Sequence, residues 1–216
     1  MAGGLTATLP IMSTVLTRAD IAYFAGLRAD QLKLLLNDRE TFDATQAERV
    51  LTAVELFRSP ASFARRVTAE WGEPWQPYDY LRYINDYLVR LADPEDPLDR
   101  LLITCPPRHG KSLFISTMLP AWYLNRYPDK RVILASYADE FAERWGRDVR
   151  NLMDVNSHIL DVAVSKASSA GNRWDIAQHR GGMKTAGVGG QITGWGAHLF
   201  IIDDPGKDAD DAFSLT

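Results

Sequence analysis

The chain has 216 residues, of which 46% are hydrophobic and 24% charged, and its formal net charge at pH 7 is −4. This composition is typical of a soluble globular protein, and it excludes a whole-surface nucleic-acid binder, because such proteins depend on many Lys and Arg contacts to phosphate. The single cysteine excludes an internal disulfide framework. No segment approaches the ~20 apolar residues that span a bilayer, so we expect a cytosolic protein without a membrane partner.

Residues 17–71 carry the apolar spacing of amphipathic helices. Thr17 and Asp20 form a capping-box pattern, in which each side chain caps a backbone N–H at the start of a helix. The run at residues 45–58 repeats apolar side chains at helical intervals, which we interpret as a packing surface. The residues before Thr17 lack the basic stretch of a signal peptide. We therefore predict an N-terminal arm and helical region over residues 1–71.

A second domain is predicted over residues 72–216. Apolar runs in it predict short strands, at residues 100–105, 131–138, 173–177, 183–189 and 198–204. Helices are predicted at residues 78–92, 110–127 and 139–153. Pro120 is expected to kink or divide the second of these helices, because proline removes a backbone N–H. Strands that alternate with helices imply a mostly parallel sheet flanked by helices.

The stretch TCPPRHGKS, residues 104–112, ends like a phosphate-binding loop. It lacks the first glycine of the G-x-x-x-x-G-K-[ST] pattern, because Cys105 stands there. Gly110 lets the backbone approach a phosphate, Lys111 carries the charge for the β- and γ-phosphates, and Ser112 carries a hydroxyl for Mg²⁺. The predicted strand before the loop and helix after it favour a nucleotide site over an ordinary strand-to-helix turn.

The middle of this loop differs from glycine-rich loops. Pro106 and Pro107 fix φ and remove N–H groups, so stiffness preforms this half of the loop. Arg108 adds a second cation, which can reach the γ-phosphate or a neighbouring carboxylate. His109 has no partner histidines for a metal site. We include Pro107, Arg108 and His109 among the candidate nucleotide-binding residues.

A second acidic pattern, LFIIDDP, lies at residues 199–205. A P-loop enzyme needs a carboxylate at the end of a neighbouring strand to hold Mg²⁺, and Asp203 has this position. Asp204 stands where many ATPases carry the carboxylate that activates water, although aspartate is one methylene shorter than glutamate. A strand that ends in a turn explains the same letters. The strands and helices between this pattern and the loop favour the paired interpretation.

Three blocks of the sequence together resemble the ATPase domain of tailed-phage terminase large subunits, over about residues 72–210. The blocks are CPPRHGKS, LPAWYLNRYPDKRVILASYADEFAERWGRDVRNLM and GVGGQITGWGAHLFIIDDPGKD, in this order. The resemblance implies an ASCE-type P-loop NTPase fold and a motor, in phages or prophages, that uses Mg-ATP to drive double-stranded DNA into the capsid. It also implies work in the host cell cytoplasm, on the capsid portal, as a self-associated ring, with the terminase small subunit.

The resemblance also assigns roles to residues of this sequence. It matches the Walker A loop to Arg108, Gly110, Lys111 and Ser112, the Walker B metal acid to Asp203, and the catalytic carboxylate to Asp204. It implies that Gln76, in the WQPY motif, reads the adenine edge, with Trp75 or Tyr78 stacked on the base. A helix-start turn with packed aromatic side chains explains the WQPY motif equally well.

Two departures from the family pattern leave alternatives open. Trp195 stands where relatives often carry an arginine, and the sequence reaches Thr216 without the family's coupling motif or nuclease domain. We therefore expect an incomplete P-loop sheet, with an exposed edge that favours self-association. The alternatives are a truncated or split-gene remnant that binds nucleotide or partners without turnover, and another P-loop ATPase of helicase type.

One further group of cations lies on the predicted helix at 139–153. Arg144, Arg147 and Arg150 recur three residues apart, so they share a face of the helix. They would meet DNA phosphate or a neighbouring subunit, or form a solvated face with the acidic residues beside them.

Overall fold

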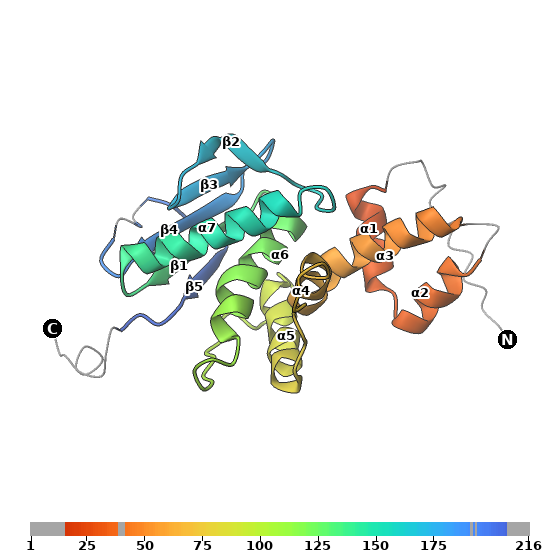
Figure 1. The fold of residues 1–216 in the computed structure, drawn as a ribbon, viewed down its shortest axis with the longest axis horizontal. Helices are drawn as coiled ribbons and strands as arrows, with labels where there is room; N and C mark the ends of the chain where they lie inside the picture. Colours follow the sequence, from red (N-terminus) through yellow and green to blue (C-terminus); the bar gives the residue numbers. More distant parts are fainter. Residues whose placement is uncertain (1–15, 39–41, 191, 193, 207–216) are drawn as a thin grey trace.

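A computed structural model describes residues 16–38, 42–190, 192 and 194–206 of the chain. The helices are α1 (Arg18–Gly26), α2 (Ala29–Leu36), α3 (Ala44–Arg58), α4 (Pro60–Val67), α5 (Asp79–Ala92), the π-helix η1 (Leu113–Met118), α6 (Leu119–Arg126) and α7 (Asp139–Val155). The strands are β1 (Arg131–Ser136), β2 (Val164–Ser169), β3 (Arg173–Ile176), β4 (Gly182–Gly187) and β5 (Leu199–Ile202). Helices α1–α3 form a lobe at one end of the molecule, and the sheet lies at the other end (Figure 1).

The N-terminal lobe has a hydrophobic core of its own. Its buried residues are Phe24, Leu32, Phe42, Val50 and Val54. The predicted capping box at the start of α1 is confirmed, because Asp20 N–H donates to the Thr17 hydroxyl and Thr17 N–H donates to the Asp20 carboxylate. The helical prediction for residues 17–71 is therefore largely correct, while the predicted arm before Leu16 lies outside the described residues.

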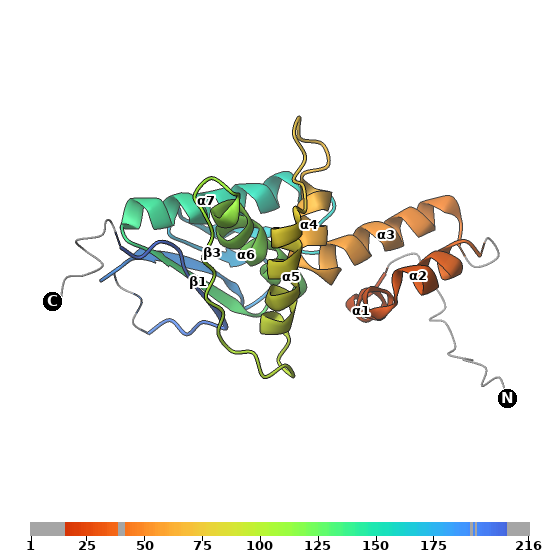
Figure 2. The same cartoon turned by 90° about the horizontal axis from the view of Figure 1, so that it is seen from below.

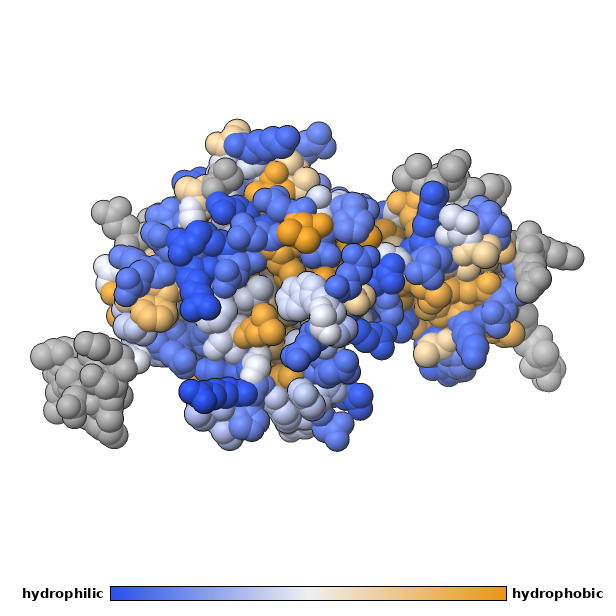
Figure 3. Space-filling view, viewed as in Figure 1, coloured by the Kyte–Doolittle hydropathy of each residue, from blue (hydrophilic) through white to orange (hydrophobic). Residues whose placement is uncertain are grey.

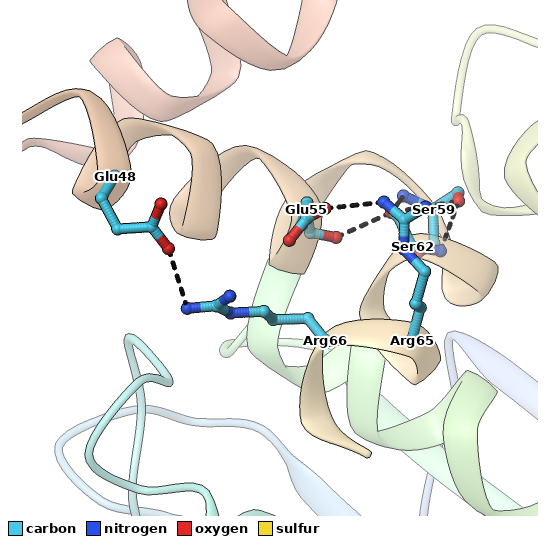
Figure 4. A network of polar contacts seen from close by, with 6 residues as sticks. All are labelled: Glu48, Glu55, Ser59, Ser62, Arg65 and Arg66. Atoms are coloured by element: carbon cyan, nitrogen blue, oxygen red, sulfur yellow. Dashed lines mark hydrogen bonds and ion pairs between the residues drawn. The ribbon is translucent and has the colours of Figure 1, made fainter. Parts of the chain in front are cut away.

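The junction between α3 and α4, at Ser59, joins the N-terminal lobe to the rest of the molecule (Figure 4). Ser59 stands between the two helices and caps α4 through its side chain. Arg65 pairs with Glu55 at 2.6 Å, and Arg66 pairs with Glu48 at 3.5 Å. These partly exposed ion pairs connect the two helices and are expected to add little stability.

Helix α6 provides the second attachment of the lobe. Trp122 Nε1 donates to the carbonyl oxygen of Phe57 at 3.0 Å, and Arg126 Nη1 donates to the same oxygen at 2.8 Å. Arg18 of α1 donates to the carbonyl oxygen of Asn125 at 3.0 Å. These three donors satisfy the last carbonyls of two helices, which have no partners within their own helices.

The sheet has the strand order β2-β3-β4-β1-β5. Strand β1 lies parallel to β4 and β5, whereas β2, β3 and β4 pair antiparallel. The expectation of a mostly parallel sheet is therefore wrong, and the sheet is mixed. The physical reason is the connections, since short turns join β2 to β3 and β3 to β4, and such turns permit only antiparallel pairing. The antiparallel strands at 173–177 and 183–189 agree with two of the predicted strands.

One face of the sheet is covered by α7 and α6 (Figures 1 and 2), and η1 packs against both of these helices. The core beneath them includes the fully buried Trp122, Trp174 and Phe114. Trp174 Nε1 donates to the carbonyl oxygen of Gly146 in α7 at 3.1 Å. A Cβ atom at Gly146 would lie 2.6 Å from the carbonyl oxygen of Gly171 and 3.0 Å from a methyl of Thr185. Helix α7 can therefore pack closely against Gly171 and Thr185 because residue 146 has no side chain.

We expect Gly146→Ala to lower the free energy of unfolding by about 1–3 kcal/mol, because overpacking a rigid backbone contact forces α7 outward. Alanine is the better helix former by about 1 kcal/mol, so an isolated helix would change in the opposite direction. Urea denaturation followed by circular dichroism measures the difference. Gly72→Ala is the matched control, because a Cβ atom there meets nothing within 4 Å. A stabilised Gly146→Ala variant would contradict the packing described for α7.

The predicted strand at residues 100–105 is not formed, because residues 101–106 have no strand partner among the described residues. Burial still alternates along them as in a strand, and Leu102 is 90% exposed between the partly buried Leu101 and Ile103. A strand requires hydrogen bonds to a neighbour, and an apolar run alone cannot supply them.

The predicted exposed edge has a counterpart at β5, where Phe200 and Ile202 are more than half exposed. Self-association stays a prediction, which sedimentation at increasing concentration checks.

Strand β2, VSKASS, lies at the edge of the sheet and was not predicted, because it carries few apolar residues. The predicted helix at 110–127 is divided into two elements, as expected, since the π-helix η1 ends at Met118 and α6 begins at the next residue, with Pro120 in its first turn.

Within the part of the chain that the structure describes, no helix has the length and apolarity to cross a membrane.

Candidate functional site

The loop before η1 and the residues after β5 meet at one end of the sheet. Lys111 Nζ lies 2.9 Å from Asp204 Oδ1 and 3.4 Å from Asp203 Oδ1. Burial acts to lower the pKa of Lys111, but the hydrogen bond to Asp204 and the charges of both carboxylates outweigh it and raise that pKa. Lys111 is therefore a firmly charged ammonium group between the two predicted acidic residues.

Two serine hydroxyls meet the carboxylate of Asp203, whose side chain is 6% exposed. Ser112 Oγ lies 3.5 Å from Asp203 Oδ1, at the limit of a hydrogen bond. Ser116 Oγ donates to Asp203 Oδ2 at 2.9 Å. Ser116 was missed in the sequence. Its spacing of four residues from Ser112, which places two helical residues on one face, is the signal that would have found it.

Three residues of the site have the left-handed backbone conformation. They are Arg108 (φ 63°), Gly110 (φ 77°) and Asp204 (φ 46°). A Cβ atom at Gly110 would meet nothing within 4 Å, so its backbone conformation, and not a lack of space, favours glycine there. At Arg108 and Asp204 the same conformation is strained, and strained residues are frequent at functional sites.

Tyr80 of α5 connects to the loop through His109. The Tyr80 hydroxyl donates to the carbonyl oxygen of His109, whose ring Nδ1 lies 2.8 Å from the carbonyl oxygen of Pro107. Partial burial, and to a smaller extent the charges of Cys105 and Tyr78, raise the pKa of Tyr80. These contacts hold the backbone between Pro107 and Gly110, a part of the loop that contains no glycine.

Two cavities lie side by side along this loop. One of about 360 Å³ is lined by residues 105–113 and Asp204. The other, of about 570 Å³, is lined by Trp75, Gln76 and Tyr78 of the WQPY motif, by Tyr80 and by Arg108. Both have Arg108, His109, Gly110 and Leu113 in their walls. The larger cavity thus lies next to the loop at residues 105–113 and shares part of its wall.

The aromatic residues of the WQPY motif have different environments. Trp75 is 7% exposed and its ring stacks on Phe114 at a centroid distance of 5.0 Å, so it belongs to the core. Tyr78 is 62% exposed, lies at the cavity and is parallel to Tyr80 at 6.2 Å. Of the two stacking candidates, only Tyr78 presents a largely exposed ring.

A cavity of about 710 Å³ lies away from this chemistry, between the N-terminal lobe and residues 158–161. Its lining includes Leu56 and Phe57, and the Phe57 carbonyl belongs to the attachment of the lobe. We therefore place the candidate site at the loop, where charged groups converge, and not at this cavity.

The donor set at the site suits Mg²⁺. Hard cations prefer oxygen ligands, and Mg²⁺ keeps several waters, so it needs only one or two carboxylates from the protein. Ser112 Oγ and Asp203 Oδ1 supply such oxygens beside the cavity of about 360 Å³. Across the described residues there is no cluster of three or more His, Cys, Asp or Glu side chains that would hold another kind of metal.

Arg144 and Arg147 of α7 are exposed and Arg150 is half-buried, and Figure 3 shows a mostly hydrophilic surface along this helix. Arg144 pairs with Asp148 at 3.8 Å, and Arg147 pairs with Glu143 at 3.4 Å. This is the solvated face that the sequence left open as one alternative. Trp195, which stands where relatives often carry an arginine, packs on the Arg131 guanidinium, whose central carbon lies 5.6 Å from the ring centroid.

Comparison with known proteins gives a family match that includes both the loop and the acidic residues of the site. The family profile described as "Terminase large subunit, T4likevirus-type, N-terminal" matches residues 102–216, which include the loop and both acidic residues. No curated protein and no solved structure matches the chain.

Proposed function

Because the chain belongs to the terminase large subunits, as an N-terminal region of the T4-like type, we propose that it is the ATPase segment of a phage or prophage DNA-packaging motor. In this proposal residues 72–216 form part of an ASCE-type P-loop domain, and residues 1–71 are an N-terminal helical appendage. The substrate is Mg-ATP, and the energy of its hydrolysis moves double-stranded DNA into the capsid.

One observation carries the proposal. Lys111 lies within 3.4 Å of carboxylate oxygens of both Asp203 and Asp204, although more than 90 residues of chain separate the loop from them. A cationic loop and an acidic strand end, brought to one edge of the sheet, form the arrangement that phosphoryl-transfer enzymes use to hold phosphates and a metal.

The residues of the chain would divide the work of hydrolysis. Lys111 would exchange its two carboxylates for the β- and γ-phosphate oxygens, and this exchange would release Asp204. Asp204, 71% exposed in its side chain, would orient the attacking water and accept its proton. Ser112 and Asp203 would hold Mg²⁺, which, when bound, neutralises charge that develops on the phosphate oxygens.

The rest of the loop would bind and orient the nucleotide. Pro107, His109 and Gly110 shape the backbone around the phosphates, and Arg108, exposed in the loop, would approach the γ-phosphate. Gln76 would read the adenine edge from the cavity of about 570 Å³. Tyr78 would stack on the base, because its ring is exposed at that cavity.

The proposed partners follow from the packaging role. They are double-stranded DNA, the terminase small subunit, the capsid portal and further copies of the chain in a ring. The place of action would be the cytoplasm of the host cell.

The test is phosphate release from ATP by the purified chain, measured with and without Mg²⁺ and with and without duplex DNA. The proposal predicts hydrolysis that requires Mg²⁺ and falls to background in Lys111→Ala. Nucleotide binding without hydrolysis would favour the alternative of a remnant that binds but does not turn over. A folded chain that neither binds nor hydrolyses ATP would contradict the proposal.

A further inference from the structure

The two oxygens of the Asp203 carboxylate have different neighbours. Oδ1 lies 3.4 Å from Lys111 Nζ and 3.5 Å from Ser112 Oγ, so both contacts are long. Oδ2 accepts a well-formed hydrogen bond of 2.9 Å from Ser116 Oγ. The shortest side-chain contact of Asp203 thus comes from a residue outside the nucleotide-binding motifs.

We propose that Ser116 is a positioning residue, which fixes the Asp203 carboxylate so that Oδ1 faces the Mg²⁺ position beside Ser112. The inference rests on the proposed function, because it concerns the metal site of that same ATPase. Lys111 and Ser112 are expected to turn toward phosphate and metal when nucleotide binds. Ser116 is then the side chain that still holds Asp203.

The helix supports this role of Ser116. The residue is fully buried in η1, so its side chain has little freedom to rotate. The N–H of Leu119 donates to the Phe114 carbonyl, five residues back, which is the π-helical pattern. Pro120 follows and has no N–H to donate to the Ser116 carbonyl four residues before it. Single π-helical turns are frequent at functional sites, because they re-aim side chains.

The preorganisation of a metal ligand has a measurable consequence. Outer partners that orient a ligating carboxylate typically change metal affinity by about 10–100-fold when they are removed. Without the Ser116 hydroxyl, Oδ2 is an unpartnered acceptor in a buried place, and the carboxylate can turn toward Lys111. Mg²⁺ binding is then weakened, while contacts of the loop with the nucleotide itself are unaffected.

Residue 117 offers a matched control. The Thr117 hydroxyl is buried, and no described group hydrogen-bonds to its oxygen atom. Thr117→Val removes that hydroxyl from the same helix at nearly constant volume, so it tests the loss of a buried oxygen that does not contact Asp203.

The experiment is calorimetric titration of the full chain with a slowly hydrolysed ATP analogue, at a series of Mg²⁺ concentrations and in EDTA. We expect Ser116→Ala to raise the Mg²⁺ concentration for half-saturation by about tenfold. The affinity measured in EDTA should stay within about twofold of the wild-type value, and Thr117→Val should match the wild type in both measurements. All variants are compared well below their melting midpoints. Should Ser116→Ala not fold, Ser116→Cys, with its weak S–H donor, replaces it and should give a smaller shift.

Two results would overturn the inference. The first is a Ser116→Ala variant with the wild-type Mg²⁺ dependence. The second is a loss of affinity that is equal with and without Mg²⁺, which would make the role of Ser116 purely structural. A wild-type chain without any Mg²⁺-dependent binding is a different result, because it would overturn the proposed ATPase function as well.

Discussion

Asp204→Asn is expected to reduce ATP turnover by about a thousandfold, because a positioned general base contributes about 10²–10⁴-fold to a rate. Asparagine has nearly the same shape but cannot accept the proton of the attacking water. Nucleotide affinity should change by less than about fivefold, since Asp204 is a partner of Lys111 in the free protein and not a predicted phosphate ligand. Phosphate release and calorimetric binding, measured side by side, separate the two effects.

Asp148→Asn is the matched control for this change, because Asp148 is a half-exposed carboxylate of α7 in an ion pair with Arg144, away from the loop. It should leave both turnover and binding unchanged. Turnover of Asp204→Asn within about tenfold of the wild type would assign the activation of water to another residue.

Trp122→Ala is expected to lower the free energy of unfolding by about 3–5 kcal/mol, the range for removing a large buried aromatic side chain. Trp122 is 1% exposed, lies in the main core and donates to the Phe57 carbonyl at the attachment of the lobe. The change therefore creates a cavity and removes one of the two donors to that carbonyl. Urea denaturation, followed by circular dichroism, measures the effect.

The control for this second change is Trp71→Ala, because Trp71 is 42% exposed. Its cost should be below about 1 kcal/mol, as for other surface substitutions. If Trp122→Ala had an equally small cost, neighbouring side chains would have moved in to fill the space left by the indole ring. The packing of α6 described here would then be incorrect.

The helices were predictable because their signals are local. Thr17 with Asp20, and the apolar spacing around Val50 and Val54, depend only on residues within one or two turns. Strand pairing depends on residues that are far apart in the sequence. The run at 101–105 therefore looks like a strand and alternates in burial like one, yet none of the described strands pairs with it.

The candidate site was predictable in its members but not in its contacts. The motifs indicated Lys111, Ser112, Asp203 and Asp204, and the structure brings these four residues together. Ser116 has no motif, since its role depends on the angle at which η1 meets the end of β5. The sequence left open whether Trp75 stacks on a base or packs in the core, and the structure shows it packed on Phe114.

The most direct test of the central claim is whether the loop at Lys111 binds nucleotide. We would titrate the purified chain with Mg²⁺ and a slowly hydrolysed ATP analogue in a calorimeter, beside Lys111→Ala and the exposed control Lys33→Ala. We predict binding by the wild type and by Lys33→Ala, and an affinity about 100-fold lower in Lys111→Ala, because charge-assisted contacts to phosphate contribute roughly 1.5–3 kcal/mol each. No binding by a folded wild-type chain, or equal binding by Lys111→Ala, would contradict the assignment of this loop as a phosphate site.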